Sequence, residues 1–408
     1  MSDTLPSERL HGLDALRGFA LLLGVALHAT MSYLPGAEFF WLAADSERSG
    51  VLAAGFHWVH SFRLSLFFLL AGFFGRLALH RLGSRRFVRD RCQRIVMPLL
   101  CLWFPVLMAI IAVLTWNAWL SNDGVMPELE PPAPLTLRNF PLTHLWFLYL
   151  LTLFYAAMLG LRAAFRISDR GGRRQVVVDG LVRRVAGPGA ALLLALPTTL
   201  ALMSLPVWWH WFGIPTPDRS LIPNLAAVVA YGLAFVAGWA LHRQPPLLAA
   251  LSRRWPLNLG IAIAASGICF QQLGLTPPSA PAGNDAATWL YAFAYAIAGW
   301  AWSLALIGLV LRYLAGYNPA RRWLADASYW VFIVHLPLVM ALQVLASRQQ
   351  APWWLEYPLL LAATLAVSLL SYTLLVRHSW LGAWLNGRRV PRPAATLAAR
   401  SMAKPDAA

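Results

Sequence analysis

His28 and Arg17 are the two residues whose types and spacing point most directly to chemistry. They lie eleven positions apart in the apolar stretch LDALRGFALLLGVALHATMSY. Eleven residues are close to three helical turns, so both side chains share one face of a helix, about 16 Å apart along its axis. Ionisable groups inside a spanning helix are costly and usually face a polar pathway or site. We therefore predict a functional role for His28; the alternative is a hydrogen bond to a neighbouring helix.

Arg63 is the second ionisable group that the sequence places inside an apolar segment. It follows His57 and His60 at three-residue spacing in FHWVHSFRLSLFFLLAGFFGR. Counted along their helices, Arg63 and His28 lie about 10 Å and about 9 Å below the same membrane boundary, so the two are predicted to meet. Arg63 needs an anionic or carbonyl partner. That partner is either a backbone carbonyl at a helix break or a substrate carboxylate or oxyanion, whereas His57 is predicted to be structural.

Two further segments carry polar or aromatic residues at membrane depth. THLWFLYLL contains His144 and Trp146, which are either interfacial anchors or substrate contacts. ASYWVFIVHLPLV contains His335 two places before Pro337. A proline frees a backbone carbonyl, and the sequence favours His335 as the group that binds it. Together with His60, these side chains form the candidate substrate-binding set.

The segment RLALHRLGSRRFVRDRCQRIVMPLL is unusually basic. Membrane topology alone explains some of its arginines, but their number exceeds what orientation requires. Guanidinium groups bind phosphate through paired hydrogen bonds. We therefore expect a phosphorylated cytosolic ligand to bind Arg85, Arg86, Arg89, Arg91 and Arg94. A second basic loop, 162–184, is interpreted as topology or lipid contact.

The composition requires that these residues belong to a membrane protein. Hydrophobic residues make up 59% of the chain and charged residues 12%, with a mean hydropathy of +0.57. A spanning helix needs about 20 apolar residues. The expected fold is therefore an all-α, polytopic integral membrane protein with about ten transmembrane helices. They are predicted near 14–34, 56–76, 95–116, 144–164, 188–208, 222–241, 256–275, 289–311, 328–347 and 355–376.

The distribution of charge predicts the orientation. The net charge is +16 among 33 basic residues, which would suggest nucleic acid if the basic residues formed one soluble face. Instead, 28 of the 33 fall in alternate loops, the positive-inside pattern of a protein with both termini in the cytoplasm. We expect a multi-pass protein of a bacterial inner (cytoplasmic) membrane that contacts membrane lipids and binds no nucleic acid.

The chain is expected to form one membrane domain, residues 1–382. A basic tail, 383–408, is predicted to be disordered and held near anionic lipid. The first apolar segment lacks the features of a cleaved signal peptide and is predicted to be a retained span. The cysteines support neither a disulfide framework nor a metal site, and no metal is expected.

Five ordered motifs resemble the membrane acyltransferase family 3, and within it the glucan biosynthesis protein C branch. They are LDALRG with Arg17 and His28, HSFRLSLFFLLAGFF, RDRCQRIVMP, HLWFLYLL and ASYWVFIVHLPLV. The resemblance extends roughly from Leu13 to Val376. Two departures are Ala71-Gly72, where Ser-Gly is common, and the single His335 where the branch often has two histidines before the proline.

The resemblance implies an O-acyltransferase that moves an acyl group, succinyl in the closest branch, from cytosolic acyl-CoA to a periplasmic or cell-surface carbohydrate. It implies that His28 is catalytic and that Arg17 is its partner on the acyl-CoA side. Arg63 completes the candidate catalytic set. A neutral imidazole can take a proton from an attacking hydroxyl, and a covalent acyl-histidine intermediate is the alternative. No tightly bound cofactor is expected; acyl-CoA is the donor cosubstrate.

A secondary transporter or flippase is the competing interpretation. In it, His28, Arg63 and His335 would line a pathway at mid-membrane. The chain lacks paired Gly/Pro-broken spans in corresponding halves, which are the best sequence signal of such transporters. The acyltransferase interpretation is therefore favoured.

Overall fold

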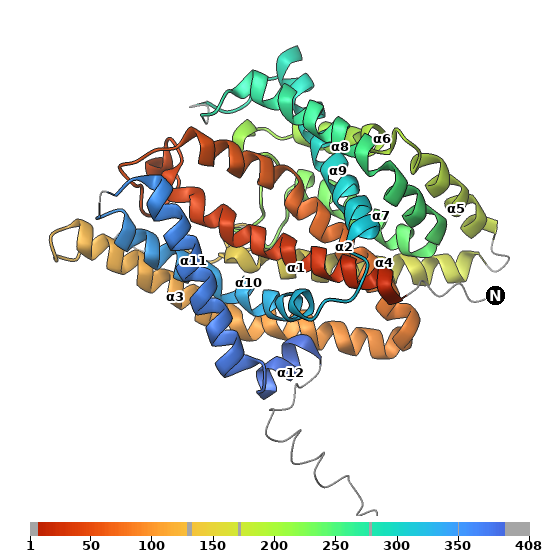
Figure 1. The fold of residues 1–408 in the computed structure, drawn as a ribbon, viewed down its shortest axis with the longest axis horizontal. Helices are drawn as coiled ribbons and strands as arrows, with labels where there is room; N and C mark the ends of the chain where they lie inside the picture. The colour runs from red at the N-terminus through yellow and green to blue at the C-terminus, as the bar shows by residue number, and fades with distance from the viewer. Residues whose placement is uncertain (1–6, 129–132, 170–172, 277–279, 350, 388–408) are drawn as a thin grey trace, which may run out of the picture.

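The fold is known from a computed structural model, which describes residues 7–128, 133–169, 173–276, 280–349 and 351–387. Within these ranges the chain is helical, apart from an isolated pairing of Thr136 with Asn139. Figure 1 shows the helices packed side by side, with α1 (Ser7–Thr30) in the middle of the view. The predicted all-α membrane architecture is confirmed.

The remaining helices follow in chain order, with the longest connections at 31–49, 122–145 and 204–224. They are α2 (Gly50–Arg91), α3 (Met97–Ser121), α4 (Trp146–Ser168), α5 (Arg173–Val185), α6 (Ala190–Met203), α7 (Leu225–Arg243), α8 (Pro245–Leu273), α9 (Ala286–Tyr313), α10 (Pro319–Ala346), α11 (Trp353–Ser371) and the short α12 (Trp380–Asn386).

The described residues contain several candidate membrane spans, and the count of ten stays a prediction. By length and apolar composition, the described residues contain eight candidate spans, or nine if the bent pair α5 and α6 forms one. One of the eight is a 72-residue stretch from Gly50 to Ser121. It contains α2, the π-helical segment Cys92–Val96 and α3, and it includes two of the predicted spans. About 20 residues cross a bilayer, so this stretch is too long for one straight crossing.

Close helix packing around α1 and α2 depends on small residues. α1 packs against α10, α2, α9 and α11, and α2 packs against α7. A Cβ at Gly72 would overlap the carbonyl of Phe235 in α7, and one at Gly238 would overlap the carbonyl of Leu69 in α2. Such glycines let helix backbones approach closely in membrane proteins. They hold α2 rigidly and so fix the position of Arg63.

The two ends of the described chain meet at one end of the bundle. His11 of α1 and Asn386 of α12 line the same cavity. The first residues of the predicted tail, 383–386, belong to α12, where Leu385 is buried. Residues 388–408 lie outside the described residues.

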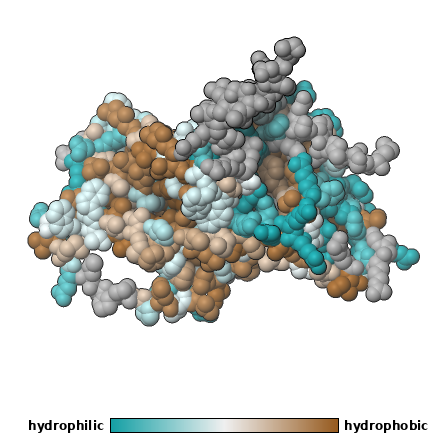
Figure 2. Space-filling view, turned by 90° about the horizontal axis from the view of Figure 1, so that it is seen from below, coloured by the Kyte–Doolittle hydropathy of each residue, from teal (hydrophilic) through white to brown (hydrophobic). Residues whose placement is uncertain are grey.

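Hydrophobic and hydrophilic side chains are segregated along the bundle. Figure 2 shows hydrophobic residues over much of the left of one face, while hydrophilic residues gather toward the right. In Figure 1 the same right-hand end holds the junction between α2 and α3. This is the surface expected of a multi-pass membrane protein with one strongly polar end.

Candidate active site

Four polar residues from three helices and one turn meet in a small cavity inside the bundle. His28 of α1, Arg63 of α2, His144 before α4 and His335 of α10 line a space of about 40 Å³. The rest of its lining is apolar or aromatic and includes Trp146. We call this space the histidine cavity. The structure thus brings together His28 and Arg63, whose depths were predicted to match.

The three imidazoles of the histidine cavity lie in ring contact. The ring centroids of His28 and His335 are 5.4 Å apart, and those of His144 and His335 are 5.2 Å apart. His144 follows Thr143, whose φ of 56° is unusual for a β-branched residue. The strained turn at Thr143 directs His144 inward, ahead of the first turn of α4.

Hydrogen bonds to backbone carbonyls orient two of these rings. Nδ1 of His335 lies 2.7 Å from the carbonyl oxygen of Phe332, and Nε2 of His144 lies 3.1 Å from that of Ile333. A carbonyl only accepts, so each of these nitrogens must donate. The other nitrogens, Nε2 of His335 and Nδ1 of His144, are buried without a partner, as is Nδ1 of His28. In neutral rings of His335 and His144, the unpartnered nitrogen is therefore an acceptor for a hydroxyl group.

The role predicted for His335 at the proline is wrong. Pro337 frees the carbonyl four residues earlier, that of Ile333, because proline has no N–H. His144 binds this carbonyl, whereas His335 binds the carbonyl of Phe332 instead. The reason is geometric, since the freed oxygen lies on the side of α10 that faces the turn before α4.

Arg63 reaches α1 at a glycine. A Cβ at Gly24 would overlap Nη1 of Arg63, so the guanidinium group lies directly against α1, one helical turn before His28. Nε of Arg63 is buried without a hydrogen-bond partner. None of the ion pairs found among the described residues involves Arg63. Arg63 therefore presents an uncompensated positive charge that an anionic ligand can pair with.

A second, larger cavity of about 590 Å³ lies toward the N-terminal end of α1. Its volume is within the range of ligand pockets, about 300–1,000 Å³. We call it the arginine-lined cavity. Its charged lining comprises Arg17, Arg81, Arg91, Arg94, Arg322, Asp14, Asp90 and Asp326.

Two aspartates each hold two arginines of the arginine-lined cavity. Asp14 lies 2.9 Å from Nη2 of Arg17 and 2.7 Å from Nη1 of Arg322. Asp90 accepts from Nε of Arg91 at 3.0 Å and pairs with Nε of Arg94 at 2.9 Å. The guanidinium groups are therefore held in place with several N–H groups left to bind a ligand.

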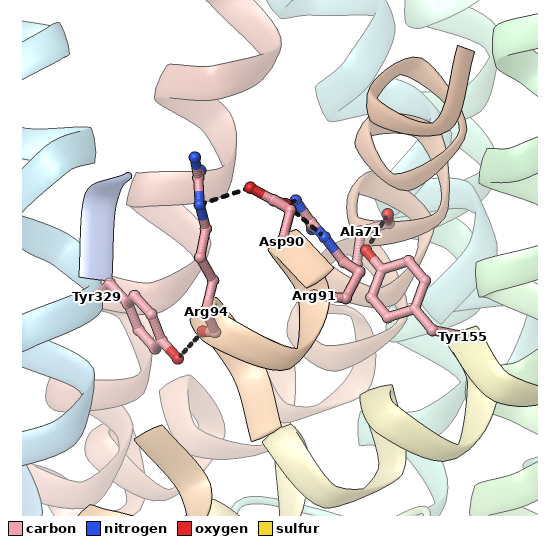
Figure 3. A network of polar contacts seen from close by, with 6 residues as sticks. All are labelled: Ala71, Asp90, Arg91, Arg94, Tyr155 and Tyr329. Carbon is pink, nitrogen blue, oxygen red and sulfur yellow. Dashed lines mark hydrogen bonds and ion pairs between the residues drawn. The ribbon is translucent and has the colours of Figure 1, made fainter. Parts of the chain in front are cut away.

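Neighbouring tyrosines fix the helical segment that carries Arg91 and Arg94. Figure 3 shows Asp90 between the two arginines, with Tyr329 and Tyr155 on either side. The Tyr329 hydroxyl donates to the carbonyl of Arg94 at 2.6 Å, and that of Tyr155 donates to the carbonyl of Ala71 at 3.0 Å. The π-helical segment starts at Cys92, so Arg91 and Arg94 lie on either side of its first residues.

The two cavities are neighbours. Both are lined by the same four apolar side chains, which form a constriction between them: Leu21, Phe67, Phe147 and Phe332. Arg17 lines one cavity and His28 the other. One face of α1 therefore connects the arginines to the histidines, as their eleven-residue spacing predicted.

Three of the arginines predicted to bind a ligand do not join the cavity. Arg85, Arg86 and Arg89 are exposed and line neither cavity, whereas Arg91 and Arg94 line the larger one. Gly83, with φ 72° and ψ 166°, breaks α2 just before them. Beyond this break, Phe87 and the residues three, four and seven positions after it face the protein, whereas Arg85, Arg86 and Arg89 lie on the opposite face of the helix and point outward.

His60 also lies outside the histidine cavity. Its Nδ1 is 3.5 Å from the hydroxyl of Tyr295 in α9, and its ring stacks on Phe56. Arg63, by contrast, faces α1. His57 is buried, with Nε2 2.7 Å from the hydroxyl of Tyr291. His60 is therefore placed with an aromatic cluster and not with the predicted substrate-binding residues.

Sequence reasoning missed two groups near the site. Arg322 joins the arginine-lined cavity through Asp14, 308 residues away in sequence. Trp41 stacks on His28, and its indole N–H donates to Gln343 at 2.8 Å. Both residues lie in segments whose sequence resembles ordinary loops or membrane interfaces, so no sequence pattern indicated a role for them. Within the described ranges, no group of three His, Cys, Asp or Glu side chains is placed to hold a metal ion.

The fold and these cavities define a polytopic membrane protein with an internal polar site, and comparison with known families gives its class. The family model described as "Acyltransferase domain" matches residues 10–373. The match covers nearly the whole chain. The chain therefore belongs to this acyltransferase family, as the resemblance in its motifs predicted.

Curated relatives of the chain share one name. "Glucans biosynthesis protein C" of Salmonella paratyphi B is 24% identical over 187 residues, which are 44% of this chain and 46% of that protein. The protein of the same name from Escherichia coli K12 is 26% identical over 154 residues, 36% of this chain and 37% of that protein. The chain thus matches less than half the length of these relatives. No solved structure matches it.

Proposed function

We propose that the protein is an O-acyltransferase that moves an acyl group from cytosolic acyl-CoA to a hydroxyl of a periplasmic or cell-surface carbohydrate. The observation that carries this proposal is the adjacency of the two cavities, with arginines at one end of a face of α1 and His28 at the other. Family membership supports the transfer of an acyl group. The names of the relatives support a glucan as the acceptor.

The arginine-lined cavity suits the phosphates of CoA. Arg17, Arg91, Arg94 and Arg322 enter it already oriented by aspartates, and oriented guanidinium groups bind phosphate with little loss of side-chain entropy. The phosphates would bind there, while the pantetheine arm passes Leu21, Phe67, Phe147 and Phe332. The thioester would then reach His28.

His28 acts as the general base in this proposal. Its imidazole takes the proton from the sugar hydroxyl as the oxygen attacks the thioester carbonyl. The C–S bond then breaks, and the imidazolium returns the proton to the departing sulfur, which releases the CoA thiol and restores neutral His28. His144 and His335 each present an unpartnered nitrogen beside it and can orient the sugar hydroxyl. An acyl-histidine intermediate on His28 is the alternative route.

Arg63 supplies the positive charge that the reaction needs. It lies beside His28 without a carboxylate among its described neighbours. A developing oxyanion on the thioester would be stabilised there. If the acyl group is succinyl, Arg63 instead pairs with its free carboxylate.

The proposal implies an orientation in the membrane. CoA is cytosolic, so the end with the arginine-lined cavity faces the cytoplasm, and both termini lie on that side. This orientation agrees with the positive-inside distribution of arginines. The enzyme then resides in a bacterial inner membrane, where its acceptor approaches from the opposite face.

Release of CoA thiol from purified protein tests the proposal. Protein in detergent receives succinyl-CoA and glucan oligosaccharides, and a thiol reagent measures free CoA while mass spectrometry detects the acylated glucan. The transporter alternative expects no thiol release. We expect His28→Ala to lower the rate by about 100-fold or more, the typical contribution of a general base, with CoA binding unchanged by calorimetry. An active variant would contradict the role of His28.

A further inference from the structure

Trp41 covers His28 on the side away from the arginines. The two rings stack with centroids 6.2 Å apart and planes at 24°. His28 lies in the last turn of α1, and Trp41 belongs to the segment 31–49 that follows it. Trp41 lines neither cavity. The His28 imidazole is thus enclosed between Trp41 and His335.

Hydrogen bonds hold Trp41 and the next residue, Leu42, in place. The Trp41 indole N–H donates to Oε1 of Gln343 at 2.8 Å, and Nε2 of Gln343 donates to the carbonyls of His28 and Ala29 at 3.0 and 3.2 Å. The next residue, Leu42, accepts from Nδ2 of Asn117 at 2.8 Å. Gln343 is fully buried. Gln343 therefore links the Trp41 indole to the backbone that carries His28.

An acyltransferase with a histidine base must discriminate between two nucleophiles. A base that removes a proton from a sugar hydroxyl also removes one from water. Water attack on the thioester carbonyl breaks the C–S bond and yields free acid and CoA thiol. Such a site needs to exclude water until its acceptor is bound.

We propose that Trp41 is the specificity-determining residue that favours a sugar hydroxyl over water at His28. This inference rests on the function proposed above. The indole closes the acceptor side of His28. A sugar ring that reaches the site displaces the indole from His28, stacks against it and covers the imidazole in its place. Water is too small to hold the indole aside. Trp41 is half-buried, so part of its ring is open to an arriving acceptor.

The partition between hydrolysis and transfer tests this role. Wild type, Trp41→Ala, Trp41→Phe and Trp41→Ala/His28→Ala are given succinyl-CoA with and without glucan oligosaccharides, and CoA thiol is measured. We expect Trp41→Ala to raise acceptor-independent release at least tenfold and to raise the KM for the glucan. Trp41→Phe, which keeps an aromatic cover, should lie between it and wild type. The double variant should release no CoA.

Trp354→Ala is the matched control, since Trp354 is 63% exposed at the start of α11 and should leave both rates unchanged. If Trp41→Ala does not fold, Gln343→Leu removes the bond that holds the indole and should raise hydrolysis in the same way. Unchanged hydrolysis in a folded variant with active transfer overturns the role of Trp41 alone. Absence of His28-dependent CoA release in wild type would instead overturn the proposed function.

Discussion

Asp14 and Asp90 determine how the arginine-lined cavity can receive an anion. Each carboxylate pairs with two guanidinium groups. Asp14 pairs with Arg17 of the same helix and Arg322 of α10, and Asp90 pairs with its near neighbours Arg91 and Arg94. Arginines clustered without acids would repel one another. The aspartates offset that repulsion and keep each planar group in one orientation, so phosphate binding requires little rearrangement.

We expect Arg91 and Arg94 to bind the phosphates of CoA, whereas Arg85 and Arg86 should not contact them. A hydrogen bond to a charged group contributes about 1.5–3 kcal/mol. We therefore expect Arg91→Ala/Arg94→Ala to weaken CoA binding by about two orders of magnitude and to reduce its salt dependence. The measurement is calorimetric titration with CoA at two salt concentrations.

Arg85→Ala/Arg86→Ala is the control for this experiment, because it removes the same charge from the same helix at exposed positions. Its CoA affinity should stay within about twofold of wild type, since exposed charges are largely screened. Equal losses in the two double variants would show that net charge, and not the cavity, binds CoA.

Helical periodicity explains which of these residues could be predicted. His28 and Arg63 were placed at one depth because each lies in an uninterrupted apolar helix, where rise per residue is fixed. Periodicity could not show which arginines after Gly83 line the cavity and which are exposed, because a positive φ at one glycine changes the face that all later residues present. The pairing of Arg322 with Asp14 is a contact between distant segments, which periodicity does not specify.

The proline-containing helix α10 depends on a residue from another element. Pro337 leaves the carbonyl of Ile333 without its helical partner, and His144 supplies the missing donor. We expect His144→Ala to lower the free energy of unfolding by about 1–3 kcal/mol, the cost of an unsatisfied buried acceptor. Thermal unfolding in detergent measures this loss.

A second substitution in α10 separates this role of His144 from simple loss of packing. Alanine at position 337 restores an N–H that can bond to the carbonyl of Ile333. His144→Ala/Pro337→Ala should therefore be more stable than His144→Ala alone. Additive losses in the double variant would contradict the proposed pairing.

The long helices were predictable and the shorter elements were not. Each predicted apolar span lies largely within a helix, because a bilayer requires internally bonded backbone. The start of the tail was expected to be disordered, yet 383–386 belongs to α12, where Leu385 packs in the core. Likewise, the segment 31–49 carries no periodic pattern, so nothing in its sequence placed Trp41 on His28.

The orientation of the molecule can be measured directly. Arg85 lies at the end with the arginine-lined cavity, and Ser46 lies in the segment that covers the opposite end of α1; both are exposed. We expect a membrane-impermeant maleimide to label Ser46→Cys in intact cells after outer-membrane permeabilisation. Arg85→Cys should react only in inverted vesicles. The reverse labelling pattern would place the arginines outside and exclude cytosolic CoA as their ligand.

The constriction of Leu21, Phe67, Phe147 and Phe332 has a consequence for the cell's energy supply. On the proposed function, acyl-CoA and the acceptor approach the site from opposite sides of an energised membrane, so the path between them must stay closed to ions. Hydrophobic rings at the narrowest part of such a path strip hydrated ions of their shells, and the resulting barrier blocks ion conduction. We therefore expect that replacing these side chains with small polar ones would increase the leak of protons and sodium through the protein.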